Sequence, residues 1–162
     1  MIVVSNTSPL TNLAAIGLFD VLHELYGTIH IAEAVWDELH AGNQIWPGTK
    51  EVEDADWIQR HTVHNESFVQ ALSLSLDKGE AETIALSVEL GATLSIIDEQ
   101  EGRKWATRFN VNVVGVLGVL IQAKSNLLIT HVGPYLDKLR YEARFFIHPI
   151  LYEAVLRKTN EL

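Results

Sequence analysis

The chain has 162 residues, 48% of them hydrophobic, no cysteine, and a formal net charge of −9. Its length and apolar content suit one domain with a sizeable core, and the lack of cysteine excludes disulfides, thiolate metal sites and cysteine nucleophiles. The acidic balance argues against a nonspecific nucleic-acid binder. We see no signal peptide and no apolar run of membrane-spanning length, and therefore expect a cytoplasmic protein that does not enter the membrane.

Apolar runs and turn residues predict short strands, in chain order, at residues 2–5, 28–31, 57–63, 92–98 and 111–115. Helical spacing of apolar residues predicts helices at residues 7–17, 18–27, 32–40, 67–76, 78–91, 99–110, 116–126, 130–142 and 148–160. The stretch 42–56 lacks periodicity and is expected to form a loop with room for one helical turn.

Strands alternate with helices through about residue 125, and this order predicts an α/β fold with three layers, α/β/α, around a central parallel sheet. We expect a single domain over residues 1–162. The helices from about residue 126 are apolar enough either to pack on the core or to build a dimer.

Polar residues follow two of the predicted strands and open or border two of the predicted helices. Asn6 and Asp98 each end a strand, and the carboxyl ends of parallel strands lie at one edge of a sheet. Glu80 and Glu82 open a helix that enters from that edge. Glu38 borders the buried stripe of its helix and is expected to point inward. Three or four carboxylates are therefore candidates to converge.

Converging carboxylates repel one another and persist only with bound cations or shared protons. Oxygen ligands without nitrogen or sulfur suit Mg²⁺ or Mn²⁺. Such ions activate water and stabilise the charge that develops during phosphodiester hydrolysis. The acidic residues thus predict a metal-dependent hydrolase, provided that they converge.

The chain resembles the PIN-domain superfamily, and more closely a prokaryotic branch of PIN-like proteins related to VapC-type toxins. Five segments carry the resemblance in this order: "VVSNTSPL", "AVWDEL", "DKGEAETIALSVELG", "LSIIDEQEGRKWA" and "VVGVLGVLIQAK". The resemblance covers about residues 1–125. It implies an Mg²⁺- or Mn²⁺-dependent ribonuclease that acts on RNA, pairs with an antitoxin protein and forms a homodimer.

The resemblance also implies a set of metal ligands. The family's first acid falls on Asn6, the second on Glu38, the third on Glu80 with Glu82 as a rival, and the fourth on Asp98. Glu38, Glu80 and Asp98 are the predicted catalytic acids. An amide at residue 6 removes one negative charge from the site, which leaves open whether the site is active or residue 6 is only a helix cap.

Thr7, Ser8, Arg103 and Lys104 are candidate contacts for the RNA substrate. Thr7 and Ser8 are equally suited to cap a helix, and the two cations to a charged surface. Glu99 is open to two interpretations: support for Asp98, or a first-turn acid that faces solvent. Gly115 and Gly118 are expected to permit a turn and close helix packing.

Two other functions fit parts of the sequence. The first is a PIN fold that has lost activity and binds RNA or a protein, which Asn6 and the net charge favour. The second is a phospho-acceptor receiver domain, which also gathers acids at strand ends. Against the receiver, the acids here come largely from helices, and no lysine ends a late strand.

Overall fold

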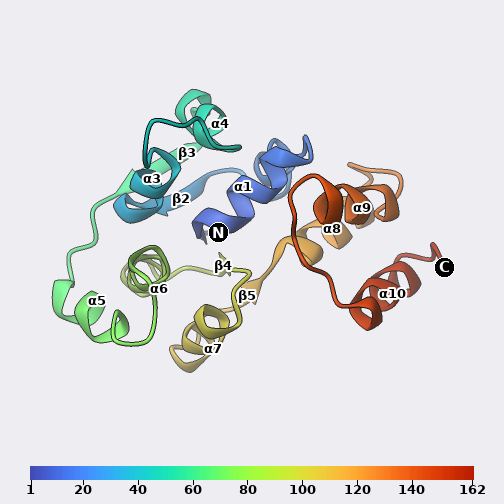
Figure 1. Ribbon diagram of the computed structural model, residues 1–162. Coiled ribbons are helices and arrows are strands. Elements are labelled where there is room, and N and C mark those ends of the chain that lie inside the picture. Colours follow the sequence, from blue (N-terminus) through green and yellow to red (C-terminus); the bar gives the residue numbers. More distant parts are fainter.

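A computed structural model describes all residues, 1–162, and contains one five-stranded sheet whose strands are all parallel (Figure 1). The strands are β1 (Val3–Ser5), β2 (Ile29–Ala32), β3 (Ile58–His61), β4 (Leu94–Ile96) and β5 (Val113–Val114). Their spatial order is β3-β2-β1-β4-β5. All five strands were predicted, with shorter bounds than expected at most of them.

Ten helices surround the sheet: α1 (Thr7–Ala15), α2 (Val21–Tyr26), α3 (Glu33–Leu39), α4 (Thr49–Asp54), α5 (Glu66–Leu72), α6 (Lys78–Leu90), α7 (Gln100–Arg108), α8 (Val116–Ser125), α9 (Gly133–Tyr141) and α10 (Pro149–Lys158). None of them combines the length and the apolar character that a bilayer crossing requires.

The structure corrects the predicted helices at two places. The second helix was expected from residue 18 but begins at Val21, because Gly17 (φ 77°) ends the preceding segment and Leu18 bonds back to the carbonyl of Leu13. The stretch 42–56 contains α4, a helix rather than a single turn. Gly48 (φ 98°) precedes α4, and its N–H donates to the side chain of Glu51.

The two faces of the sheet are covered by different helices, which confirms the three-layer prediction (Figure 1). Val3 packs in a core with residues of α1, α2 and α8, whereas its neighbour Val4 packs on the opposite face with residues of α6. This alternation follows from the two-residue period of a strand. The largest core also includes Leu136, Leu139 and Val155, so α9 and α10 pack on the core of their own chain.

The strand order places a switch point between β1 and β4. From β1 the chain adds β2 and β3 on one side, and it then crosses to add β4 and β5 on the other. Ligands of open α/β sheets bind beyond the carboxyl ends of the strands at such a point. The order also rules out the receiver alternative, because receivers have the order 2-1-3-4-5.

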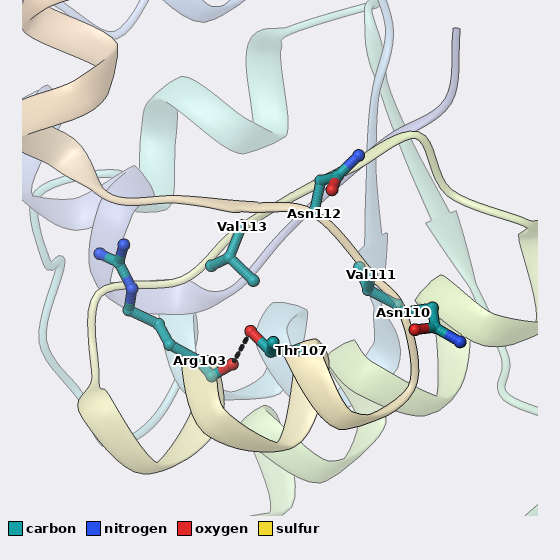
Figure 2. A pocket seen from close by; sticks show the side chains of 6 residues that line it. All are labelled: Arg103, Thr107, Asn110, Val111, Asn112 and Val113. Carbon is teal, nitrogen blue, oxygen red and sulfur yellow. Dashed lines mark hydrogen bonds between the residues drawn. The ribbon is translucent and has the colours of Figure 1, made fainter.

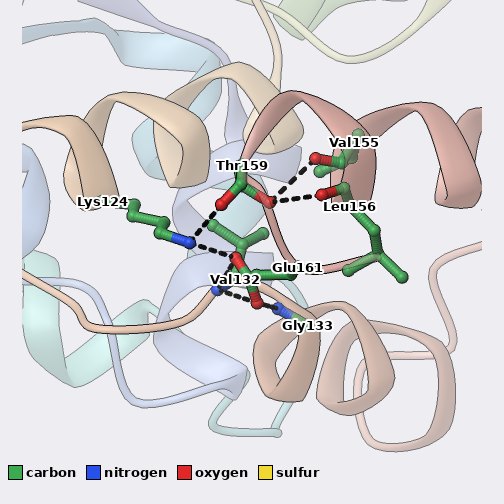
Figure 3. Close-up of polar contacts among 7 residues, drawn as sticks. All are labelled: Lys124, Val132, Gly133, Val155, Leu156, Thr159 and Glu161. Carbon is green, nitrogen blue, oxygen red and sulfur yellow. Dashed lines mark hydrogen bonds and ion pairs between the residues drawn. The ribbon is translucent and has the colours of Figure 1, made fainter.

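The C-terminus is fastened to α9 by a buried carboxylate (Figure 3). Glu161 accepts hydrogen bonds from the backbone N–H groups of Val132 and Gly133 and from Lys124 Nζ, each at 2.9 Å. Lys124 also donates to the carbonyl of Thr159. Burial alone would raise the pKa of Glu161, but these donors outweigh it and lower the pKa to about 2.

Candidate functional site

Asn6 and Asp98 lie side by side at the switch point. Asn6 follows β1, and its backbone N–H donates to the carbonyl of Ile96 in β4 at 3.0 Å. Asp98 follows β4 and is held by the backbone N–H of Val116, at 2.8 Å from Oδ1, and more weakly by Ser8 Oγ, at 3.5 Å from Oδ2. Burial raises the pKa of Asp98 to about 6, against the effect of the Val116 N–H.

Glu38 reaches the same edge from α3. Its Oε2 accepts a hydrogen bond of 2.5 Å from Thr7 Oγ1, at the start of α1. Burial raises the pKa of Glu38, and the negative charges of Asp77 and Glu99 raise it further, while the Thr7 hydroxyl opposes the shift. Glu38 is exposed, so it does not point into the core as expected, but its carboxylate is directed to Thr7, which follows β1.

Glu80 lies in the first turn of α6 and has two roles there. Its Oε1 accepts from the backbone N–H of Asp77 at 3.2 Å, and Asp77 Oδ1 accepts from the N–H of Glu80 at 2.8 Å, which is a capping box. The other oxygen, Oε2, faces Gly102 in α7. Burial and the nearby Asp77 and Glu99 raise the pKa of Glu80 to about 7.

Three glycines leave room for these three carboxylates. A Cβ atom on Gly79 would lie 2.1 Å from Glu38 Oε1, one on Gly102 would lie 3.2 Å from Glu80 Oε2, and one on Gly115 would lie 2.9 Å from Asp98 Oδ1. The sequence predicted a turn and close packing at Gly115, and no role for Gly79 or Gly102. The sequence could have indicated these two positions in one way. A glycine inside a predicted helix destabilises the helix, so its presence suggests that a neighbouring group needs the space.

Asn6 occupies the N-cap position of α1, but its side chain makes no capping hydrogen bond. Instead its Oδ1 accepts from Thr83 Oγ1 at 3.4 Å, and its Nδ2 donates to Glu99 Oε2 at 3.3 Å. The side chain is buried and faces the acidic residues. A role as a helix cap alone therefore does not describe it.

Two of the predicted site residues lie apart from this group. Glu82 turns to the start of α3, where its Oε1 accepts from the backbone N–H of Ala34 at 3.1 Å. Lys104 is exposed and pairs with Glu101 at 3.5 Å. Periodicity could not separate Glu80 from Glu82, since both lie in the first two turns of α6. The packing of α3 distinguishes the two residues, because the carboxylate of Glu82 binds a backbone N–H in the first turn of α3 and that of Glu80 does not.

Arg103 connects the acidic site to a neighbouring cavity (Figure 2). Its Nη1 and Asp98 Oδ1 both lie 2.9 Å from the point where Gly115 would carry a Cβ, so the guanidinium and the carboxylate are close. The cavity has a volume of about 470 Å³ between α7 and the segment that leads into β5, and it is lined by Arg103, Thr107, Asn110, Val111, Asn112 and Val113. Its lining is mostly polar.

The acidic residues fit Mg²⁺ or Mn²⁺ by their chemistry. Every donor is an oxygen atom, and none of Glu38, Glu80 and Asp98 forms a salt bridge, so their charges are uncompensated except by the nearby Arg103. As the side chains lie, no three acidic or histidine groups surround a single point. Binding of an ion therefore requires rotation of these side chains.

Comparison with known protein families agrees with this architecture. A family model described as a PIN domain matches residues 2–161. No curated protein and no solved structure matches the chain. Because the family model covers nearly the whole sequence, the nuclease-like PIN fold extends from β1 to the end of α10. The chain belongs to the PIN-domain family.

Proposed function

We propose that this protein is a metal-dependent endoribonuclease related to VapC-type toxins, which hydrolyses RNA phosphodiester bonds with Mg²⁺ or Mn²⁺. The observation that carries the proposal is the grouping of Glu38, Glu80 and Asp98 at the switch point. The neighbouring residues Thr7 and Ser8 contact two of these acids, and the charge of Glu99 acts on all three.

Glu38, Glu80 and Asp98 would hold the ion, with Asn6 lining the same site. When bound, the ion would supply activation of water and neutralisation of the charge on the phosphate. The hydroxyl of Thr7 orients Glu38, and the N–H of Val116 orients Asp98. In the chain without an ion these contacts orient Glu38 and Asp98, and the side chains would turn from there to converge on the ion.

The RNA backbone would meet Arg103 beside Asp98, with the hydroxyls of Thr7 and Ser8 on the other side of the acids. The amides of Asn110 and Asn112 line the adjacent cavity and offer donors and acceptors of the kind that read single-stranded bases. A local cation next to an acidic centre reconciles RNA binding with the net charge of −9. Lys104 is a more distant backbone contact.

Cleavage of RNA by the pure protein with Mn²⁺ tests the proposal. Asp98→Asn and Glu80→Gln should each lower the rate by at least about 100-fold, because each removes a charge that holds the ion. The matched control is Glu82→Gln, two residues from Glu80 on the same helix, which should retain activity. Equal cleavage by the wild type and Asp98→Asn would remove Asp98 from the site.

An antitoxin protein and a second copy of this chain are the proposed partners. Phe146 in the turn between α9 and α10 is exposed and lines a cavity with Arg140, and Tyr141 at the end of α9 and Ile150 and Leu151 at the start of α10 are also exposed. Large exposed apolar side chains near one another in the sequence favour this segment as the interface. The double variant Phe146→Asp with Ile150→Asp should leave the fold intact. It should abolish association of the chain with a second copy or with an antitoxin protein, as measured by size-exclusion chromatography.

The second candidate function is a PIN fold that binds RNA or protein without cleaving it. The observations that favour it are the amide at residue 6 and the lack of three converging ligands as the side chains lie. Calorimetric titration with Mn²⁺ separates the two functions. Failure to bind at millimolar Mn²⁺ would favour the binding module.

A further inference from the structure

A cavity of about 430 Å³ lies at the turn between α9 and α10, and its lining combines apolar side chains with two arginines. It is lined by Arg140, Arg144, Phe145, Phe146, Ile147 and Pro149. Neither arginine forms a salt bridge, and the guanidinium of Arg140 lies 4.5 Å from the ring centre of Tyr152. This α9–α10 cavity therefore suits an apolar side chain that has a carboxylate close by.

The 45–56 segment, which contains α4, has the complementary character, with apolar side chains followed by acids. Ile45 is 72% exposed and Trp46 is 42% exposed. Residues 51–56 contain four acids and no lysine or arginine, and Asp54 and Asp56 are exposed and form no salt bridge. The indole N–H of Trp46 donates to a backbone carbonyl at 3.1 Å, so Trp46 is held in place and binding would cost little ordering of its side chain.

No other exposed surface combines these features. The remaining large apolar side chains that are exposed outside the α9–α10 region stand alone in the sequence: Met1, Leu74, Val88, Phe109, Leu127 and Leu162. Only Ile45 and Trp46 are adjacent both to each other and to a run of acids. In Figure 1, α4 and α10 lie far apart, so the 45–56 segment cannot fill the cavity of its own chain.

We propose that the 45–56 segment of one chain docks into the α9–α10 cavity of a second copy. The side chains of Ile45 and Trp46 contact the apolar lining, and the two exposed aspartates pair with the two arginines. The same contact made in both directions gives a closed dimer with two-fold symmetry. The inference rests on the association with a second copy that belongs to the proposed function, and it names the two surfaces that meet.

Charge favours contact between these two surfaces over contact between two identical ones. Each chain has a net charge of −9, so two copies repel each other over most of their surfaces. Residues 138–144 contain three cations and one acid, whereas the charged residues among 51–56 are all acids. Contact between the two segments therefore replaces repulsion with attraction, and opposite charges facing each other also fix the orientation of the partners.

Charge reversal tests the docking, with the mass in solution measured by size-exclusion chromatography coupled to light scattering. The cavity variant is Arg140→Glu with Arg144→Glu, and the segment variant is Asp54→Lys with Asp56→Lys. Each should raise the dissociation constant of the dimer by about 100-fold or more, because like charges then face each other. An equimolar mixture of the two variants should form a dimer again, since each altered surface then meets its complement.

The matched control is Arg157→Glu with Lys158→Glu, which reverses two exposed cations of α10 that do not line the cavity. It should dimerise as the wild type does. If a reversed variant does not fold, Ile45→Asp decides in its place, because this exposed side chain can change without loss of the core and its charge should prevent docking.

A mixture of folded variants that stays monomeric would overturn the inference. Wild-type affinity in either reversed variant would also overturn it and would leave the association of two copies standing on other surfaces. A wild-type chain that is monomeric at every concentration would overturn both the inference and that association, and would leave the cavity to the proposed antitoxin protein. These measurements use neither RNA nor Mn²⁺, so the proposed ribonuclease activity stands or fails separately, by the cleavage assay.

Discussion

At the scale of single residues, the acidic site depends on glycines, which have no Cβ atom to collide with the carboxylates. Gly79 and Gly115 carry no Cβ at the points where Glu38 and Asp98 place their carboxylate oxygens. The obstacle that a methyl group at Gly79 would meet is the end of a flexible side chain, not the backbone. A substitution there can therefore displace the acid and leave the fold unchanged.

Gly79→Ala should separate function from stability. Alanine in a helix is favoured over glycine by up to about 1 kcal/mol, so the unfolding temperature should stay the same or rise. Mn²⁺ affinity and RNA cleavage should both fall, because the carboxylate of Glu38 has to move. Circular dichroism and calorimetry measure the two effects on the same sample.

Gly118→Ala is the matched control for this prediction. A Cβ at Gly118 would lie 2.4 Å from Val114 Cγ2, a packed side chain of β5. That variant should lose stability while its folded form still binds Mn²⁺. Loss of stability in Gly79→Ala with unchanged metal affinity would contradict the role assigned to Gly79.

At the scale of elements, the Glu161 carboxylate joins α8, α9 and the end of the chain (Figure 3). The side chain is 8% exposed, and its removal would leave the N–H groups of Val132 and Gly133 without their partner. An unpaired buried donor costs about 1–3 kcal/mol, which is more than an exposed ion pair contributes.

Glu161→Ala should lower the free energy of unfolding by about that amount, and Glu153→Ala, whose side chain is 59% exposed in α10, should change it little. The effect should depend on pH in a defined direction. The pKa of Glu161 in the folded chain is about 2, below its ordinary value of 4.5, so its contribution is complete above pH 4.5 and is lost as the pH falls toward 2. Thermal unfolding of both variants between pH 2 and pH 7 measures it, and equal losses in the two variants would contradict the prediction.

At the scale of the whole molecule, the metal-free fold tolerates a group of acids that repel one another. The pKa values of Asp98 and Glu80 are raised to about 6 and about 7, so the folded chain binds protons more tightly there than the unfolded chain does. Their contribution to stability is therefore complete at pH values below about 4 and is lost as the pH rises through 6 to 7. A divalent cation should replace those protons.

Mn²⁺ should accordingly raise the unfolding temperature more at pH 8 than at pH 5, because protons compete for the same oxygens at the lower pH. Chelation with EDTA should reverse the gain. Differential scanning calorimetry at the two pH values checks this, with Asp98→Asn as the control that should show a reduced gain at both. A gain that does not change with pH would place the ion elsewhere.

Periodicity and turn residues predicted every strand, most helices and the parallel sheet, because these depend on local spacing. The start of α2 and the length of α4 were not predictable, since a backbone bond from Leu18 to Leu13 and the turn at Gly48 decide them. Asn6 and Asp98 were placed correctly at strand ends. The sequence could not predict whether Glu80 or Glu82 belongs to the acidic group, because both lie near the start of the same helix. Only the packing of α3 distinguishes them.

The sequence by itself determined the fold class, the resemblance to PIN domains and the helices and strands that carry the acids, because apolar periodicity and strand order along the chain specify them. Only the tertiary structure decided that the strand order is β3-β2-β1-β4-β5, that three glycines lie under three carboxylates, and that Asn6 meets Glu99. Each of these is a contact between segments far apart in the chain. The spacing of residues within one segment carries no information about such contacts.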